Sequence, residues 1–164
     1  MKRILVLASG ALLAGCASFN GSSLVPGAST AAQAEALMGP PAQQLSLPNG
    51  DTAIYFSRLP QGRAMYVVTV GPDGVMKSIE QRLTPQNLTR LVPGTWTSKE
   101  VRELFGPPGN SVRFARQQRE VWSYRYYPDY ERRIIHVQFS DDGVVREVLD
   151  MNDDVRRKGP GGRH

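Results

Sequence analysis

Two stretches of the chain, residues 65–70 and 134–139, place hydrophobic residues at every second position, with the period of two that is typical of a β-strand. Each stretch is followed by an Asp-Gly pair, which favours a tight hairpin turn because both residue types tolerate a positive φ. Runs rich in aromatic and β-branched residues flank both stretches. The strands predicted in this way are residues 53–58, 65–70, 75–79, 121–127, 134–139 and 144–149.

A helical spacing precedes each group of strands. Thr30 with Gln33, and Thr97 with Glu100, form the capping-box pattern that starts a helix. A Gly-Pro-Pro sequence then ends each helical segment, because glycine accepts the left-handed conformation of a helix end and proline cannot continue a helix. The apolar faces are Ala34, Leu37 and Met38 in the first predicted helix, and Val101, Leu104 and Phe105 in the second.

Each helical segment and the strands behind it form one copy of a repeat that opens with Leu-Val-Pro-Gly. We therefore predict an α+β fold of two tandem modules, residues 24–82 and 83–150, each with a helix and a three-stranded antiparallel sheet. Residues 151–164 are polar and then glycine-rich, which predicts a disordered tail. Because each module is small, we expect the two to fold as one cooperative unit.

The N-terminus has the features of a bacterial lipoprotein signal over residues 1–15. Lys2 and Arg3 precede a short apolar run, and Leu13-Ala14-Gly15-Cys16 resembles the lipobox in which the cysteine receives diacylglycerol. An ordinary cleaved signal with an incidental cysteine is the alternative. Residues 16–23 are small and polar, which predicts a flexible lipidated tether. Ala17 follows where an aspartate would favour retention in the inner membrane, so we expect the outer membrane, periplasmic side.

Few residues have the types and spacing that catalysis or metal binding requires. The formal charge of +5 is spread out, with Arg156-Arg157-Lys158 as the single basic run, so we expect no nucleic-acid partner. His136 on a strand and Asp141-Asp142 in a hairpin turn are common for structural reasons. No metal-ligand spacing or nucleophile motif accompanies them, and Cys16 is the sole cysteine. We predict no enzymatic activity, metal, cofactor or small-molecule substrate, apart from the covalent lipid.

Aromatic residues are the remaining signal. Trp122, Tyr124 and Tyr126 share one face of a predicted strand, and Tyr127 and Tyr130 follow in the next turn. We expect Trp122 and Tyr124 to pack beneath the helix, as core residues. Tyr126, Tyr127 and Tyr130 lie toward the hairpin end, where we predict contacts with a protein partner or with lipid headgroups.

The second module resembles the SmpA/OmlA (BamE-like) family of small outer-membrane lipoproteins. The matching residues run from Leu83-Thr84 through Gly94 and Gly106-Pro107-Pro108 to Trp122-Ser123-Tyr124 and the hairpin at residues 137–144. The first module matches more loosely, with Tyr55 at the position of Trp122. The tandem arrangement also resembles the β-lactamase-inhibitor type, which grips an enzyme with a concave sheet.

Both resemblances imply a binding module. We expect an accessory or scaffold factor in outer-membrane protein assembly or envelope integrity, with outer-membrane assembly proteins as partners. The alternative is a periplasmic protein-binding or inhibitor lipoprotein whose paired modules form one concave sheet.

Overall fold

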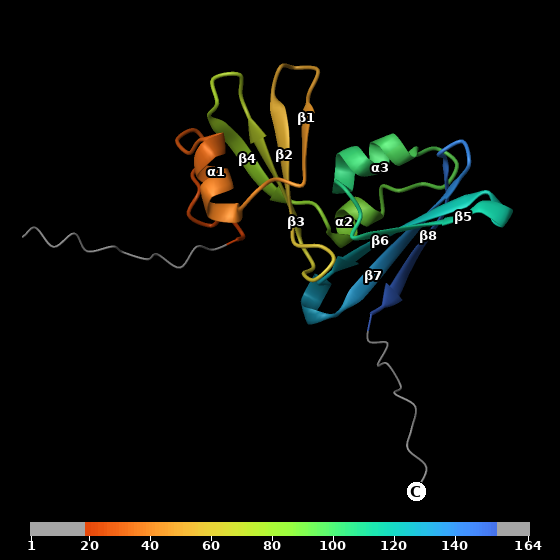
Figure 1. The fold of residues 1–164 in the computed structure, drawn as a ribbon. Helices are drawn as coiled ribbons and strands as arrows, with labels where there is room; N and C mark the ends of the chain where they lie inside the picture. Colours follow the sequence, from red (N-terminus) through yellow and green to blue (C-terminus); the bar gives the residue numbers. More distant parts are fainter. Residues whose placement is uncertain (1–18, 154–164) are drawn as a thin grey trace, which may run out of the picture.

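The computed structural model describes residues 19–153, which are drawn in colour in Figure 1. The expected signal peptide, the predicted lipidation site Cys16 and residues 154–164 of the expected tail lie outside this range. Within it, the chain has the predicted α+β class, with helices and two separate antiparallel sheets.

Each module contains a helix followed by a four-stranded antiparallel sheet in simple strand order. The first module comprises α1 (Ala31–Met38), β1 (Gln43–Ser46), β2 (Thr52–Ser57), β3 (Met65–Val70) and β4 (Met76–Gln81). The second comprises α2 (Pro85–Leu88), α3 (Ser98–Phe105), β5 (Asn110–Phe114), β6 (Arg119–Tyr126), β7 (Arg133–Ser140) and β8 (Val145–Asn152), with short 3₁₀ turns η1 (Ala115–Gln117) and η2 (Pro128–Tyr130).

The prediction of three-stranded sheets is therefore wrong by one strand in each module. The missed strands, β1 and β5, are edge strands with polar sequences, and every residue of β5 is exposed. Their pairing with β2 and β6, rather than a hydrophobic pattern, makes them strands. β1 has one hydrophobic residue, Leu45, and β5 has two, Val112 and Phe114, which is too short a pattern to predict a strand.

Both predicted capping boxes are present. The Thr30 hydroxyl accepts from the Gln33 backbone N–H, and the Thr97 hydroxyl accepts from that of Glu100, while each N3 side chain accepts from the cap backbone. The cap residue of each helix also forms a β-bridge to the residue just before the last strand of its own sheet, Thr30 to Val75 and Thr97 to Val144. Each helix start is thus fixed to its own hairpin.

The strand pairings of the two sheets correspond residue by residue, with small shifts in numbering. Adding 67 to numbers in β1, 68 in β2 and 69 in β3 and β4 converts the pairs of the first sheet into those of the second. The pair Ile54 and Val68, for example, becomes Trp122 and Val137. The expectation that Tyr55 occupies the position of Trp122 is wrong, because a one-residue difference in register moves a side chain to the opposite face of a sheet.

The layers alternate between helix and sheet, with α2 and α3 between the two sheets in Figure 1. On the first sheet, Ile54 and Phe56 pack with α1, whereas Ala53 and Tyr55 belong to a second core that includes α3 and the second sheet. A single hydrophobic core therefore crosses the module boundary. The two sheets do not form the one concave sheet expected for an inhibitor, because α3 lies between them.

Both ends of the described chain are packed onto the body, which corrects two expectations. Phe19 packs against the first core and Gly21 is buried, so residues 19–23 are not a free tether. Met151 and Asn152 belong to β8, and the Asp153 carboxylate lies 2.5 Å from the Arg63 guanidinium, so these residues are not part of a disordered tail.

Candidate functional site

Of the three tyrosines predicted to contact a partner, Tyr126 lies in the core, and that prediction is wrong. β6 alternates without interruption, so Tyr126 points to the same side as Trp122 and Tyr124, and only 1% of it is exposed. Its hydroxyl donates to Asp150 Oδ2 at 2.8 Å. Burial, and secondarily the bond to Asp150, raises the pKa of Tyr126 to about 12. The phenol is therefore a neutral donor that fixes the end of β6.

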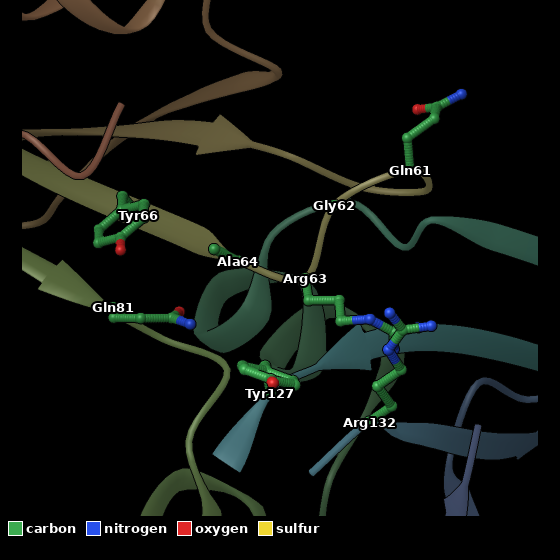
Figure 2. Close-up of a pocket in the computed structure, with 8 residues that line it drawn as sticks. All are labelled: Gln61, Gly62, Arg63, Ala64, Tyr66, Gln81, Tyr127 and Arg132. Carbon is green, nitrogen blue, oxygen red and sulfur yellow. The ribbon is translucent and has the colours of Figure 1, made fainter. Parts of the chain in front are cut away.

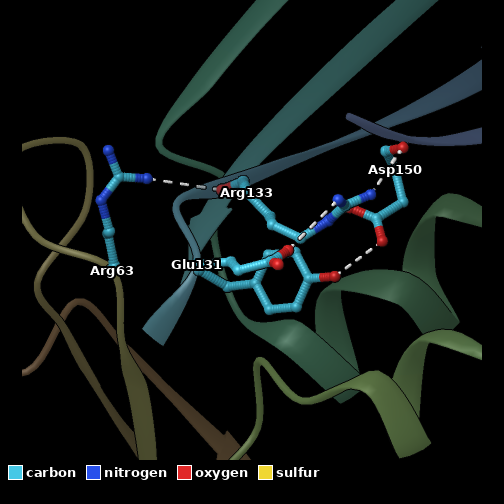
Figure 3. A network of polar contacts seen from close by, with 5 residues as sticks. Arg63, Glu131, Arg133 and Asp150 are labelled. Carbon is cyan, nitrogen blue, oxygen red and sulfur yellow. Dashed lines mark hydrogen bonds and ion pairs between the residues drawn. The ribbon is translucent and has the colours of Figure 1, made fainter. Parts of the chain in front are cut away.

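A polar network surrounds this hydroxyl (Figure 3). Arg133 Nε donates to the other Asp150 oxygen at 2.9 Å, and that bond raises the pKa of Arg133. Glu131 lies 3.8 Å from Arg133, and Arg63 donates to the Arg133 carbonyl oxygen at 3.4 Å. Because Arg63 belongs to the loop between β2 and β3, the network ties the hairpin end of the second sheet to the first module.

Tyr127 and Tyr130 are exposed, as predicted. Their side chains are 51% and 89% exposed, and their rings meet nearly at right angles with centroids 6.3 Å apart. Asp129 and Tyr130 have φ angles of 45° and 64°, in the left-handed region that such residues seldom adopt. Backbone strain of this kind is most common at functional sites, so Tyr127 and Tyr130 remain candidates for a binding contact.

An open hollow of about 610 Å³ lies beside these tyrosines, at the junction of the two modules. In Figure 2, Arg63 and Arg132 lie on one side of this junction hollow, Tyr66 and Gln81 on the other, and Tyr127 between them. The Arg63 guanidinium is paired with Asp153. Among residues 19–153, no hydrogen bond or ion pair engages the Arg132 side chain. The hollow thus offers one unpaired cation beside two aromatic rings.

The most extended candidate surface is the face of the second sheet that points away from α3, which we call the outer face. It carries four of the exposed large hydrophobic side chains, at 36–49% exposure, and the half-buried Val121 and Ile134 lie between them. The sequence reading missed much of this surface because it missed β5, although Val112 and Phe114 alternate within it. The four exposed residues are Val112, Phe114, Leu149 and Met151.

Polar side chains cross the middle of the outer face. Ser123 Oγ lies 2.9 Å from His136 Nδ1, and the Gln138 amide donates to Glu147 at 2.8 Å. Among the described residues, no aspartate or glutamate hydrogen-bonds to the His136 ring, as a catalytic triad would require. No described backbone N–H donates to the Ser123 hydroxyl. The pair is therefore a cross-strand hydrogen bond that satisfies two polar groups on a sheet surface.

A second hollow opens above Ser123 and His136. It has a volume of about 380 Å³, with the sheet residues as its floor and Leu59 and Pro60 of the first module as one wall. Arg125 lies at its rim, where its guanidinium is 3.2 Å from the Asp153 carboxylate. We call this depression in the outer face the Ser123 hollow.

Two further searches of the structure found nothing. Residues 19–153 contain no cluster of three or more His, Cys, Asp or Glu side chains arranged to hold a metal ion. None of the described helices is long and apolar enough to cross a membrane.

Comparison with known proteins gives little more. No known protein family matches the chain, and no curated protein does. Among solved structures, the chain is similar to a DUF4309 family protein, YjgB, from Bacillus subtilis, with 16% identity and a TM-score of 0.32. The alignment covers 80% of this chain and 84% of that one.

Proposed function

We propose that the protein is a lipid-anchored, non-catalytic binding protein on the periplasmic side of the outer membrane, where it serves as an accessory or scaffold factor in outer-membrane protein assembly. The observation that carries this proposal is the outer face of the second sheet. Four exposed large hydrophobic side chains share this face, and exposed hydrophobic surface rimmed by polar residues marks an interaction site. The lipobox at Cys16 and the resemblance to SmpA/OmlA lipoproteins support the location and the class of partner.

The composition of the outer face fits a protein partner. Apolar side chains occupy β5 and β8, and Arg125, His136 and Gln138 lie among them. Interfaces between proteins combine an apolar centre with hydrogen-bonding groups in this way, and arginine and methionine are enriched in them.

Capture of partners from solubilised membranes tests the proposal. Leu149→Asp places a carboxylate on the outer face, and Val92→Asp does the same at an exposed valine in the loop before α3. We expect Leu149→Asp to lose barrel-assembly subunits from the captured material, and Val92→Asp to retain them. Because both positions are exposed, the unfolding free energies of the two variants should lie within about 0.5 kcal/mol of that of the original chain.

Other outcomes would contradict the proposal. If the captured partner is a single soluble hydrolase, the inhibitor interpretation replaces the assembly interpretation. If both variants capture assembly subunits equally well, the outer face is not the binding surface.

The membrane anchor has a separate test. Cys16→Ser removes the sulfur that would carry diacylglycerol, so we expect the protein to leave the membrane fraction or to remain unprocessed. Cell fractionation and intact-mass measurement would show this. Normal processing and membrane association of the variant would argue against lipidation at Cys16.

A further inference from the structure

We infer that the outer face of the second sheet receives an amphipathic α-helix of the partner protein, at the face equivalent to the one that the C-terminal end of α3 contacts on the first sheet. The inference rests on the proposed function, because it names the element by which the proposed partner binds. It derives from the repeat, which supplies a covered copy of the same surface within the same molecule.

The outer face is equivalent to the side of the first sheet that α3 covers. Under the numbering shifts given above, the pair Tyr55 and Val67 becomes Ser123 and His136. Tyr55 and Val67 are buried in the core shared with α3, whereas Ser123 and His136 lie on the outer face and are partly exposed. One copy of the surface therefore has a helix against it and the other copy is bare.

The covered copy shows how a helix fits this surface. The Tyr55 hydroxyl donates to the Glu103 carbonyl oxygen in α3 at 2.5 Å. Gly106, at the end of α3, packs so closely that a Cβ there would lie 2.8 Å from the Tyr55 ring and 3.1 Å from the Met65 methyl carbon. The end of the helix thus rests on the centre of the sheet.

The bare copy keeps part of the hydrophobic surface that is buried in the covered one. Four of the hydrophobic residues on the covered side of the first sheet have hydrophobic equivalents on the outer face. The equivalent pairs are Leu45 and Val112, Leu47 and Phe114, Ala53 and Val121, and Met65 and Ile134.

The outer face is also more apolar at its far edge than its covered counterpart. Leu149 and Met151 occupy the positions of Glu80 and Arg82, which are polar and form an ion pair at 3.3 Å. A solvated edge strand is expected to carry polar residues at such positions. The apolar residues widen the surface across β8.

The two positions that differ explain the Ser123 hollow. Serine replaces Tyr55 and histidine replaces Val67, so the ring that supports the end of α3 has no counterpart on the outer face. The space of about 380 Å³ above Ser123 is the result. We therefore expect the partner helix to supply the missing bulk, with one large apolar side chain inserted beside the wall formed by Leu59 and Pro60.

The chemistry of the partner segment follows from these contacts. It is a helix with apolar residues on one side, because the outer face presents exposed hydrophobic residues on β5 and β8. It also carries hydrogen-bonding groups, because polar side chains lie between these two strands. Packing of a helix on a sheet is the arrangement that both modules already use. A second copy of this chain or an extended strand is distinguished by the experiment below.

Site-specific photo-cross-linking in membranes tests the inference with the full chain. Benzoylphenylalanine replaces Phe114 or Leu149 on the outer face, and Val92 as the matched exposed control. We expect cross-links from the first two positions only, to partner residues three or four apart on one helix. Cross-linked residues that alternate by two, a cross-link to a second copy of this chain, or no cross-link above the Val92 control would overturn the inference.

A second variant tests the hollow directly. Ser123→Tyr restores the residue that the first sheet has at the equivalent position and fills the space that the partner side chain would enter. We expect a severalfold loss of partner capture with an unchanged thermal melting curve. Unchanged capture by a folded Ser123→Tyr protein would show that the hollow is not used.

The two proposals fail separately. Cross-links to a strand of a barrel-assembly subunit would overturn the helix inference and leave the proposed function in place. Cross-links to a helix of a protein outside envelope assembly would do the reverse.

Discussion

The two sheets of this protein have the same strand order, hairpins and register, yet the first is covered on both faces and the second on one. The difference arises because α3 serves two sheets. Its hydrophobic face packs into the core of its own module, and its C-terminal end contacts Tyr55 and Met65 of the first sheet. No described helix follows β8 to do the same for the second sheet. Among residues 19–153 the outer face of the second sheet is therefore uncovered by a helix, and it carries exposed hydrophobic residues where a terminal repeat usually has a polar face.

The largest effect should come from separating the two modules. Residues 83–153 expressed alone would expose the side of α3 that rests on Tyr55 and Met65. We expect this fragment to melt far below the described body or to remain unfolded, because small modules bury too little surface alone. Circular dichroism during heating would measure it. A fragment as stable as the whole chain would mean that the shared core contributes nothing.

The next effect compares equivalent positions on the two sheets. Tyr55→Ala removes a buried ring and its hydrogen bond to α3, and should cost about 3–5 kcal/mol of unfolding free energy. Ser123→Ala changes a partly exposed side chain and should cost less than about 1 kcal/mol. Urea denaturation of both variants would make the comparison. Equal losses of unfolding free energy would show that the outer face contributes as much to stability as the covered face.

A smaller effect concerns the hydroxyl of Tyr126. Tyr126→Phe removes its hydrogen bond to Asp150 and should destabilise the fold by about 0.5–1.5 kcal/mol at neutral pH, whereas Tyr130→Phe, at 89% exposure, should have no effect. The raised pKa gives a sign to the pH dependence. A phenol whose pKa rises from 10.0 to about 12 on folding stabilises the fold below pH 10 and loses that contribution as the pH rises toward 12.

The difference in unfolding free energy between the original protein and Tyr126→Phe should therefore decrease between pH 10 and about pH 12. Denaturation curves at neutral pH and at increasing alkaline pH would follow it. A difference that stays constant would show that the hydroxyl does not titrate with folding.

Local signals in the sequence predicted much of this fold. The capping boxes at Thr30 and Thr97 give the helix starts, and the alternation over residues 65–70 gives β3 with the bounds that the structure has. These features depend on neighbours within one turn or one strand. They are predictable because the residues that determine them are adjacent in sequence.

The errors concern relations between distant segments. β5 pairs with β6, and its short sequence, with only Val112 and Phe114 hydrophobic, gives no sign of that partner. The equivalence of Tyr55 and Trp122 is wrong because the two copies are offset by 67 residues in the helices but by 68 in this strand, and one residue reverses the face of a strand. Tyr126 could have been placed correctly, since it alternates in phase with Trp122 and Tyr124.

The sequence does contain a signal that the first sheet is covered on both faces. Residues 53–56, Ala-Ile-Tyr-Phe, form an uninterrupted hydrophobic run in which all four residues are buried. A continuous run indicates a strand that is covered on both faces. The corresponding run in β6 alternates, which is the pattern of a strand with one bare face.

The packing of Phe19 determines how far the folded body can move from its proposed anchor. The Phe19 ring lies 6.0 Å from that of Tyr66, and the Arg58 guanidinium stacks 4.3 Å above it. Three Cα steps separate Phe19 from Cys16, a span of about 11 Å at most. A folded body of the size of residues 19–153 has a radius of gyration of about 14 Å. If Cys16 carries the lipid, the segment between the lipid and Phe19 is shorter than the radius of the folded domain. The domain would then lie against the bilayer surface and bind only partners that reach that surface.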